Sequence, residues 1–499
     1  MSEEREKREE RIVSYIPKTD HHYRTISSYI EEVPDDDYIK APKSAIEAFN
    51  DIKFAVRIHF GIYSILKLND ESWQFIKMSY EEKAKYNELY KTFNPENFNA
   101  EEWMSLFERS GIRAMAFTTK HHEGFSLFDT KTRVRRRINW TAENGPVVEE
   151  CDLAYSIMET PFKRDMVGEL CAAAKKHNIK MDLYFSHPDW YDADFAPYVY
   201  HPMKTENMKE LLNDEDINSP RYDTLIGFTA PANGKESEDR MLKRHCDQLK
   251  EILTKYDNVD MICLDMWFGP KIWTRIKETI KEIRKIKPDI MLRSRGIGNY
   301  GDYYTPENYM PGNAGNTNMP WMVIHALGSS FSYDAEAKNY KGTKWIIDNL
   351  ASCVAKGGNF MVGIGPDGGG AFHPEAVRQL EATGEWLKIN GGAIYNTIIY
   401  SEEHYMEKHT DNNIYFTSSK DKSYLYVISV SDNLHDVKIT MNKDEFKSLE
   451  IYTPEGLKQI PESDIVKTDN FMIFPKDICG KLYNSEYKYA YAFRLTYDK

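Results

Sequence analysis

The sequence of 499 residues lacks the patterns that identify several common classes of protein. Its six cysteines have neither CxxC nor other metal-type spacing, which argues against a zinc site and a disulfide framework. No stretch offers the roughly 20 apolar residues of a membrane span, and the start, MSEEREKREE, has no apolar secretory signal. We therefore expect no membrane span and, for the chain as it stands, a cytoplasmic location; the alternative is a periplasmic or secreted protein whose signal has been removed.

Motifs for several kinds of chemistry are also missing. The sequence has no GxSxG nucleophile elbow and no HExxH zinc motif. The run GGNFMVGIGPDGGG lacks the GK[ST] ending of a phosphate loop, so a turn is expected there. Acidic residues exceed basic ones, 78 against 65, and the net charge of -13 argues against nucleic acid or an anionic membrane as a partner.

What the sequence does contain is a regular alternation of short apolar runs and longer amphipathic ones. The strand-like runs are 54–58, 114–117, 180–185, 260–264, 289–292 and 360–364, and 162–178 and 245–257 have helical periodicity. This pattern predicts an α/β fold with a (β/α)8-like barrel, and the short alternating runs that follow predict an antiparallel β-sandwich. We predict a charged N-terminal extension over 1–40, a catalytic domain over 41–398 and a sandwich domain over 399–499.

The first five strand-like runs are each followed by polar or ring-bearing side chains. In a barrel the strands are parallel, so their C-terminal ends share the face where barrel enzymes build their sites. We therefore expect one pocket to collect the residues that follow these runs, namely His59, Lys120-His121-His122, Ser186-His187, Asp265 and Arg293-Ser294-Arg295.

Two carboxylates are candidates for catalysis. Asp265 directly follows a run that a barrel would bury, and Glu307 stands further on in GDYYTPENYM. Two carboxylates in one cleft are the minimum for glycoside hydrolysis, in which one attacks or activates and the other donates a proton. Each also has a structural interpretation, Asp265 as an ion-paired residue at a strand end and Glu307 as a residue of a first helical turn.

The histidines at 59, 121 and 122 are candidates for metal ligands or for hydrogen-bond donors to sugar hydroxyls. Adjacent residues on an extended strand point to opposite faces, so His121 and His122 are not expected to bind one ion. We therefore expect no metal and no cofactor, and either sugar-binding or core histidines. Arg295 offers a fixed fork of donors that can hold a carboxylate or a hydroxyl pair, or form a surface ion pair.

Six stretches, in this order, carry a resemblance to a known family: FAVRIHFGIYS, FNAEEWMSLFERSGIRAMAFTTKHHEGFSLFDTKT, VGELCAAAKKHNIKMDLYFS, QLKEILTKYDNVDMICLDMWF, GGNFMVGIGPDGGG and GEWLKINGGAIYNT. They span residues 50–400 and resemble the family 29 glycoside hydrolases, the α-L-fucosidases. The resemblance implies a retaining exo-glycosidase that removes terminal α-L-fucosyl residues through a covalent glycosyl-enzyme and needs no metal.

The resemblance also implies roles for individual residues. Asp265 matches the nucleophile and Glu307 the acid/base, for which we expect a pKa raised by apolar surroundings or by the charge of Asp265. Other matches are the sugar-binding positions His59, His121, His122, Tyr184 and Arg295, the positions Met266 and Phe331 beside the C6 methyl group of fucose, and Trp73, a weaker match because Ser72 replaces the glutamate before it.

The sequence departs from the family at positions close to these motifs. Phe60 and Gly296 replace tryptophans, Gly363 replaces an asparagine and Met322 a glutamate, and the stretches 133–160 and 192–240 look long. These departures leave two alternatives open, a non-catalytic glycan-binding relative and a hydrolase of a related sugar such as an α-L-galactoside. The expected partner is a fucosylated oligosaccharide or glycoconjugate, and the sequence is compatible with a homo-oligomer.

Overall fold

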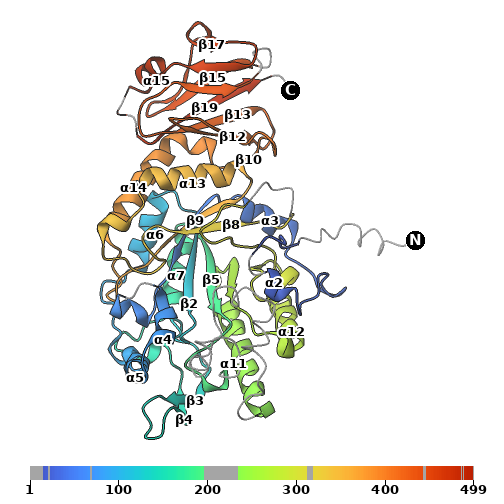
Figure 1. Ribbon diagram of the computed structural model, residues 1–499, viewed down its shortest axis with the longest axis vertical. Helices are drawn as coiled ribbons and strands as arrows, with labels where there is room; N and C mark the ends of the chain where they lie inside the picture. Colours follow the sequence, from blue (N-terminus) through green and yellow to red (C-terminus); the bar gives the residue numbers. More distant parts are fainter. Residues whose placement is uncertain are drawn as a thin grey trace, which may run out of the picture.

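The computed structural model describes residues 15–20, 23–67, 70–195, 234–311, 318–441, 446–484, 486 and 488–497. The molecule is elongated, with a larger α/β part and a smaller β part stacked along its long axis (Figure 1). Within the described residues, no helix combines the length and the apolar character that crossing a bilayer requires.

A curled sheet of seven parallel strands forms the centre of the larger part. Its strand order is β7 (Met291–Leu292), β6 (Met261–Asp265), β5 (Lys180–Ser186), β2 (Ala114–Lys120), β1 (Phe54–Ile58), β9 (Asn359–Ile364) and β8 (Met322–Ala326). Every predicted strand has a counterpart here, whereas β8 was not expected. Strands β1, β2, β6 and β9 are buried along their whole length, which is why most of their residues are apolar, with exceptions such as Arg57 and Lys120.

The gap between β7 and β8 is filled by an irregular segment, residues 303–307. Single bridges connect Arg293 with Tyr303 and Glu307 with Ile324, so this segment lies between the two edge strands. The backbone N–H of Asn308 also donates to the carbonyl of Ile324 at 3.0 Å. The predicted barrel-like fold is therefore confirmed, with one side built from irregular backbone that carries Glu307.

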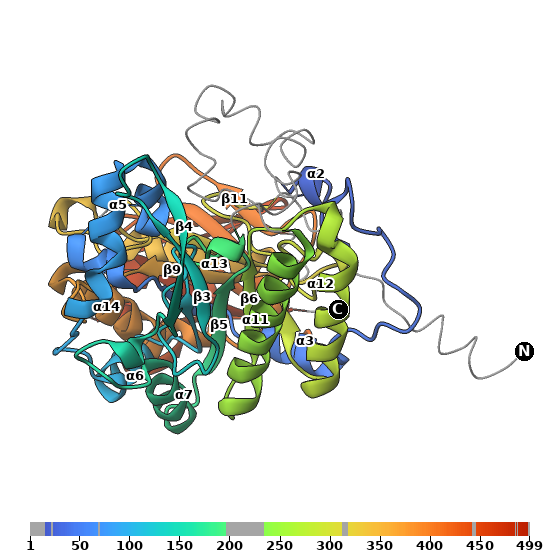
Figure 2. The ribbon, with the colours of Figure 1, turned by 90° about the horizontal axis from the view of Figure 1, so that it is seen from below.

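Helices surround the curled sheet, as the view from below shows (Figure 2). They are α3 (Lys43–Asn50), α6 (Ala100–Arg109), α7 (Met166–Lys176), α11 (Gly234–Lys255), α12 (Pro270–Ile286), α13 (Thr343–Ala355) and α14 (Pro374–Asn390). In α6 the Asn99 side chain caps the first turn by accepting from the N–H groups of Glu101 and Glu102. The apolar side chains of α6, including Trp103 and Phe107, recur at helical spacing and so share one face of the helix. That face is buried.

Shorter elements connect these units. The helices α2 (Tyr23–Ile26), α4 (Gln74–Lys77) and α5 (Tyr80–Asn87) come early in the sequence, and the 3-10 helices η1 (Ile62–Leu66) and η2 (Glu71–Trp73) follow β1. The hairpin of β3 (Val134–Asn139) and β4 (Val147–Leu153) accounts for the long stretch 133–160 and projects at the end of the molecule away from the smaller part (Figure 1). Most of the other long stretch, residues 196–233, lies outside the described residues.

The N-terminal extension packs on the larger part where it is described. Lys281 of α12 forms ion pairs with Asp35 at 2.8 Å and Asp37 at 2.9 Å. The hydroxyl of Tyr38 donates to the carbonyl of Tyr300 at 2.5 Å. The acidic run of this segment therefore contacts a basic helix face.

Antiparallel sheets make up the smaller part, as predicted. One contains β10 (Thr397–Ile399), β11 (Met406–Lys408), β12 (Asn413–Ser419), β13 (Tyr424–Val430), β15 (Phe446–Thr453), β16 (Gly456–Gln459) and β19 (Ala490–Tyr497). The other contains β14 (Val437–Thr440), β17 (Val466–Lys467) and β18 (Phe471–Phe474), with α15 (Lys476–Tyr483) beside it. The larger sheet begins at Thr397, and apolar side chains such as Phe416, Val427 and Phe474 form a separate core.

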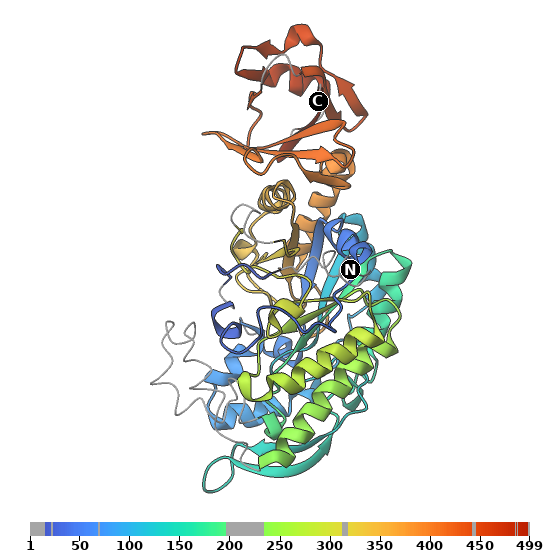
Figure 3. The same ribbon diagram turned by 90° about the vertical axis from the view of Figure 1, so that its right-hand side faces the viewer.

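The smaller part rests on α13 and α14 (Figure 3). The hydroxyl of Tyr415 donates to Asp348 of α13 at 2.8 Å. The indole of Trp386 of α14 donates to the carbonyl of Ala490 at 3.0 Å. Buried tyrosines and aliphatic residues of β12, β13 and β19 belong to the same apolar cluster as the helices, so the two parts share a packed interface.

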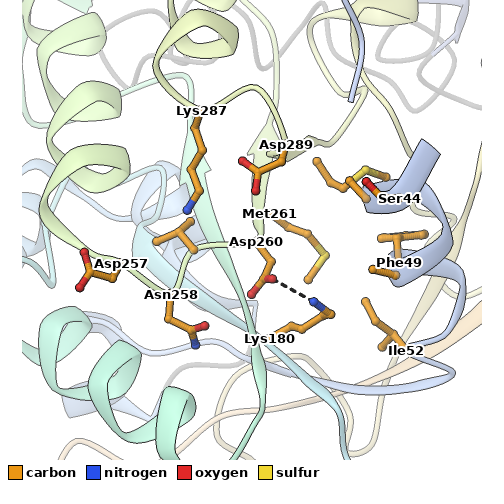
Figure 4. A pocket seen from close by; sticks show the side chains of 14 residues that line it. Ser44, Phe49, Ile52, Lys180, Asp257, Asn258, Asp260, Met261, Lys287 and Asp289 are labelled. Atoms are coloured by element: carbon orange, nitrogen blue, oxygen red, sulfur yellow. Dashed lines mark hydrogen bonds and ion pairs between the residues drawn. The ribbon is translucent and has the colours of Figure 1, made fainter. Parts of the chain in front are cut away.

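A hollow of about 350 Å³ lies where β5, β6 and β7 begin (Figure 4). Its wall includes the ion pair of Lys180 with Asp260, 3.0 Å long, and the side chains of Phe49 and Met261. This is the N-terminal end of the strands, opposite the end where barrel enzymes place their sites.

Candidate active site

Asp265 and Glu307 contact the same guanidinium group. Asp265 is the last residue of β6, and Glu307 belongs to the segment between β7 and β8. Nη1 of Arg295 lies 2.8 Å from Oδ1 of Asp265, and Nη2 lies 2.8 Å from Oε1 of Glu307. The fully buried Arg293 makes a second set of contacts, at 3.6 Å to Asp265 and 3.1 Å to Glu307. The structure therefore brings the two candidate carboxylates together.

Asp265 is held as an ionised group. The hydroxyl of Tyr184 donates to its Oδ2 at 2.6 Å, and Nε2 of His122 lies 3.9 Å from the same oxygen. Burial alone would raise the pKa of this carboxyl, but the guanidinium groups of Arg295 and Arg293 outweigh that effect. The pKa of Asp265 consequently lies well below its usual value.

Glu307 differs from the sequence-based expectation, because its pKa is lowered rather than raised. Burial raises the pKa, and so does the charge of Asp265, but the nearby guanidinium groups together outweigh both. The third of these groups is Arg57, whose Nη1 lies 3.8 Å from Oε1 of Glu307. Glu307 is therefore ionised at neutral pH and must take up a proton before it can act as an acid.

Three histidines lie beside the carboxylates. His59 follows β1, and His121 and His122 follow β2. The ring centroids of His121 and His122 are only 4.2 Å apart, so the expectation that they point to opposite faces is wrong. The reason is that β2 ends just before them and they enter a turn. Nδ1 of His121 lies 2.5 Å from the Ser72 hydroxyl, and Nδ1 of His122 lies 2.5 Å from that of Ser186.

These histidines are neutral. Burial, the largest effect on each, lowers the pKa of His121 to about 3 and brings those of His59 and His122 well below the usual value. Within the described part of the chain, no three His, Cys, Asp or Glu side chains gather closely enough to hold a metal ion.

The remaining predicted sugar-binding residues surround these rings. The Tyr184 ring stacks on His121 with centroids 5.4 Å apart, and the Phe331 ring stacks on His59 at 5.2 Å. Trp73 meets His122 edge to face at 4.8 Å. Met266 directly follows Asp265 and is nearly buried. Each residue singled out from the sequence as catalytic or sugar-binding thus belongs to one cluster.

Two of the departures from the family are explained by contacts at the cluster itself. Gly296 has a φ of +72°, and a Cβ there would lie 2.2 Å from the carbonyl oxygen of Met266. A tryptophan cannot occupy that position without moving the backbone. At Gly363 a Cβ would lie 2.4 Å from Cδ1 of Phe331, so the missing side chain makes room for this ring.

The other two departures lie in the apolar core. Phe60 packs against Phe93 at 5.4 Å and against Trp103 at 6.3 Å. Met322 is fully buried in β8.

Several residues of the cluster received no role from the sequence. Arg57 is charged in the middle of the buried strand FAVRI, and this anomaly was a usable signal. Arg293 was expected in the same pocket as Arg295, but no role followed from that, and the sequence does not show that both reach the same two carboxylates. Ser72 and Glu123 lie behind His121, and only the folded chain brings them there.

Comparison with known proteins agrees with this geometry. The family model described as "Alpha-L-fucosidase" matches residues 27–392. The chain belongs to the α-L-fucosidase family. It is accordingly a glycoside hydrolase with the barrel and sandwich of that family.

Relatives of the family match over most of the chain. The α-L-fucosidase of Dictyostelium discoideum is 26% identical in an alignment of 492 positions that covers 90% of this chain and 92% of the relative. The tissue α-L-fucosidase of Rattus norvegicus is 26% identical and covers 70% of this chain and 69% of its own.

Solved structures share the fold. The α-L-fucosidase isoenzyme 1 from Paenibacillus thiaminolyticus superposes with a TM-score of 0.69 at 22% identity, over 92% of this chain and 99% of its own. The trapped covalent intermediate of the family 29 α-L-fucosidase from Bacteroides thetaiotaomicron, in complex with 2-fluoro-fucosyl fluoride, gives 0.69 at 21% identity over 94% and 100%.

Proposed function

We propose that this chain is a retaining exo-α-L-fucosidase in which Asp265 is the nucleophile and Glu307 the acid/base. The observation that carries the proposal is the contact of Arg295 with both carboxylates at 2.8 Å, at the end of the barrel strands where such enzymes act. Retaining glycosidases need carboxyl groups about 5–5.5 Å apart, and two acids that share one guanidinium are near neighbours. The trapped covalent intermediate of the Bacteroides relative supports retention.

In the first step Asp265 attacks the anomeric carbon of the terminal sugar. The bond from that carbon to the leaving oxygen breaks, and Glu307 gives its proton to this oxygen. In the second step a water molecule loses a proton to Glu307 and attacks the same carbon, which releases Asp265. Tyr184 and Arg295 hold one oxygen each of Asp265 in the resting site, and both contacts stabilise the carboxylate as a leaving group in the second step.

The change of role at Glu307 follows from charge. The negative charge of Asp265 raises the pKa of Glu307. When Asp265 becomes an ester, this charge disappears while the arginines remain, so the pKa of Glu307 falls. Glu307 is then ionised and can act as the base that takes a proton from the attacking water.

The sugar-binding roles rest on the chemistry of the cluster. The neutral imidazoles of His59, His121 and His122 can each donate one hydrogen bond to a hydroxyl group. Met266 and Phe331 provide apolar surface for a methyl group, which supports a 6-deoxy sugar such as fucose. One methyl group in an apolar pocket discriminates by only about 1–3 kcal/mol, so α-L-galactosides are the related substrate to compare.

Hydrolysis of an aryl α-L-fucoside tests the proposal. The wild type should release the phenol, and Asp265→Gly should lose about three or more orders of magnitude in kcat because no other group can form the glycosyl-enzyme. The matched control is Asp257→Gly, which changes an exposed aspartate at the opposite end of the strands. Equal activity of wild type and Asp265→Gly would reject the nucleophile, and sugar binding without any hydrolysis by the wild type would favour the non-catalytic alternative.

A further inference from the structure

A buried chain of three side chains lies behind His121. The Ser72 hydroxyl is 2.5 Å from Nδ1 of His121, and it lies close enough to the Glu123 carboxyl to lower the pKa of that group. Oε2 of Glu123 lies 3.6 Å from the same Nδ1. The exposed fractions are 0% for Ser72, 3% for Glu123 and 4% for His121, so water does not compete for these contacts.

The surroundings of Glu123 favour its protonated form. Gly61, which follows β1, is so close that a Cβ there would lie 3.0 Å from Oε1, and Oε2 has no hydrogen-bond partner among the described residues. The titratable groups that face it are Lys120 at the end of β2, Asp189 after β5, Tyr63 of η1, Tyr86 of α5 and Tyr155, which follows β4. Burial is the largest effect and raises the pKa of Glu123 to about 8, even though Ser72 and Lys120 lower it.

The direction of the hydrogen bonds depends on the proton of Glu123, because a serine hydroxyl carries only one hydrogen. A protonated Glu123 can donate to Ser72, which then donates to Nδ1 of His121, and the imidazole keeps its hydrogen on Nε2. An ionised Glu123 can only accept a hydrogen bond, so the serine hydroxyl donates to it. Nδ1 of His121 must then carry the imidazole hydrogen and donate to Ser72, and Nε2 becomes a bare acceptor. His121 itself stays neutral throughout, since its pKa is about 3.

The orientation of His121 makes this difference matter for the sugar. Its ring lies against Tyr184 and His59, whose centroids are 5.4 and 5.7 Å away. Within the described part of the chain, Nε2 has no hydrogen-bond partner, so it is the atom left for a ligand. A Nε2–H group and a bare nitrogen require opposite roles of the sugar hydroxyl that meets them.

We propose that Glu123 is a positioning residue that acts through Ser72 to keep the hydrogen of His121 on Nε2, where it donates to a hydroxyl group of the bound sugar. The inference rests on the proposed fucosidase function for the identity of that sugar. It concerns two residues, Ser72 and Glu123, that do not themselves need to touch the ligand.

Calorimetric titration of fucose into the wild type and Glu123→Gln tests the proposal. The amide of glutamine donates to Ser72 at every pH, so it mimics the protonated acid. From about two pH units below the pKa of Glu123 to about one unit above it, the wild-type affinity should fall about tenfold because the donor is lost. Over the same pH range the affinity of Glu123→Gln for fucose should change by no more than about twofold. The exposed-site control Glu385→Gln should lose affinity with pH as the wild type does.

The same pH dependence in the wild type and Glu123→Gln would overturn the inference, and so would a pH-independent wild type. The ¹⁵N resonances of His121 provide a second readout, which holds even if the variant does not fold. Below the pKa of Glu123 the wild type should show hydrogen on Nε2 and none on Nδ1, and the reverse tautomer would overturn the proposal. Absence of fucose binding at any pH would reject the proposed function, while the nitrogen resonances would still test the contacts behind His121.

Discussion

Arg295 contacts Asp265 and Glu307 through its two terminal nitrogens, each at 2.8 Å. One cation therefore stabilises the ionised forms of both carboxylates. Together with Arg293 and Arg57, Arg295 lowers the pKa of Glu307, although burial and the charge of Asp265 each raise it and the sequence predicted a raised value. We therefore expect the lowered pKa of Glu307, the acid/base residue, to determine how the activity depends on pH.

The charge of Arg295 should set the alkaline limb of the pH profile. The acid form of Glu307 is lost as pH rises through its pKa, so a lowered pKa moves this limb of kcat/KM toward acid. Arg295→Met removes a positive charge and should move the limb to higher pH by about one unit or more, with a lower maximum rate. Arg295→Lys keeps the charge without the fork and should leave the limb close to that of the wild type. A limb that stays in place in Arg295→Met would contradict this account.

Glu307→Gln should impair substrates according to their leaving group. For an unactivated fucosyl disaccharide, kcat/KM should fall about 10²- to 10⁴-fold because the departing alkoxide needs a proton. For an aryl fucoside with an acidic phenol the loss should be clearly smaller. The comparison is steady-state kinetics of both substrates, with the exposed residue change Glu336→Gln as the control. Equal losses on both substrates would argue against an acid/base role.

Gly363→Ala should weaken the preference for fucose over galactose. An added Cβ would lie 2.4 Å from Phe331, so the ring must move away from its place beside His59. Because the methyl group is worth only about 1–3 kcal/mol, we expect the ratio of kcat/KM for α-L-fucoside and α-L-galactoside to fall by up to about tenfold. In Gly391→Ala the new Cβ meets only the Tyr395 ring, at 3.3 Å, and the ratio should not change. An unchanged ratio in Gly363→Ala would exclude Phe331 as a determinant of the sugar.

Glu123 should make the protein less stable as pH rises. Its pKa is raised to about 8 in the folded state, against about 4.3 in an unfolded chain. Between these values the folded state binds one more proton, so its contribution is full below the lower value and is lost as pH rises through the upper one. The free energy of unfolding should fall by about 1.4 kcal/mol per pH unit through this group alone.

Denaturant unfolding of the wild type and Glu123→Gln at several pH values measures this effect. The difference between the two curves isolates Glu123 from other buried acids with raised pKa values, such as Glu71 and Asp192. The exposed-site change Glu385→Gln should keep the wild-type slope. Parallel curves for wild type and Glu123→Gln would show that Glu123 is not protonated in the folded protein.

Much of the fold could be predicted from the sequence because buried strands consist mainly of apolar residues. Strands covered on both faces appear as continuous apolar runs, and β1 was located at the residues where the structure has it. Strand β8 was missed although four of its five residues are apolar, because a short apolar run alone does not separate a strand from a segment of buried helix. The closure of the barrel by residues 303–307 depends on isolated bridges, for which no sequence pattern exists.

The grouping of the candidate carboxylates and sugar-binding residues in one cluster could be predicted from the sequence, but the electrostatics of the cluster could not. The ends of the strands supplied Asp265, Arg295 and the histidines. The lowered pKa of Glu307 depends on the directions of three long arginine side chains, which spacing cannot reveal. The approach of Ser72 to His121 joins η2 with the turn that follows β2, two segments that are distant in the sequence. The cytoplasmic location and the homo-oligomer stay predictions.

Covalent labelling tests the central claim most directly. The wild-type protein is treated with 2-fluoro-fucosyl fluoride, digested, and analysed by mass spectrometry. We expect the added 2-fluoro-fucosyl mass on the peptide that contains Asp265, with fragment ions that assign it to this carboxylate, and no such mass in Asp265→Gly. A label on another residue, or turnover of the reagent without any label, would contradict the account.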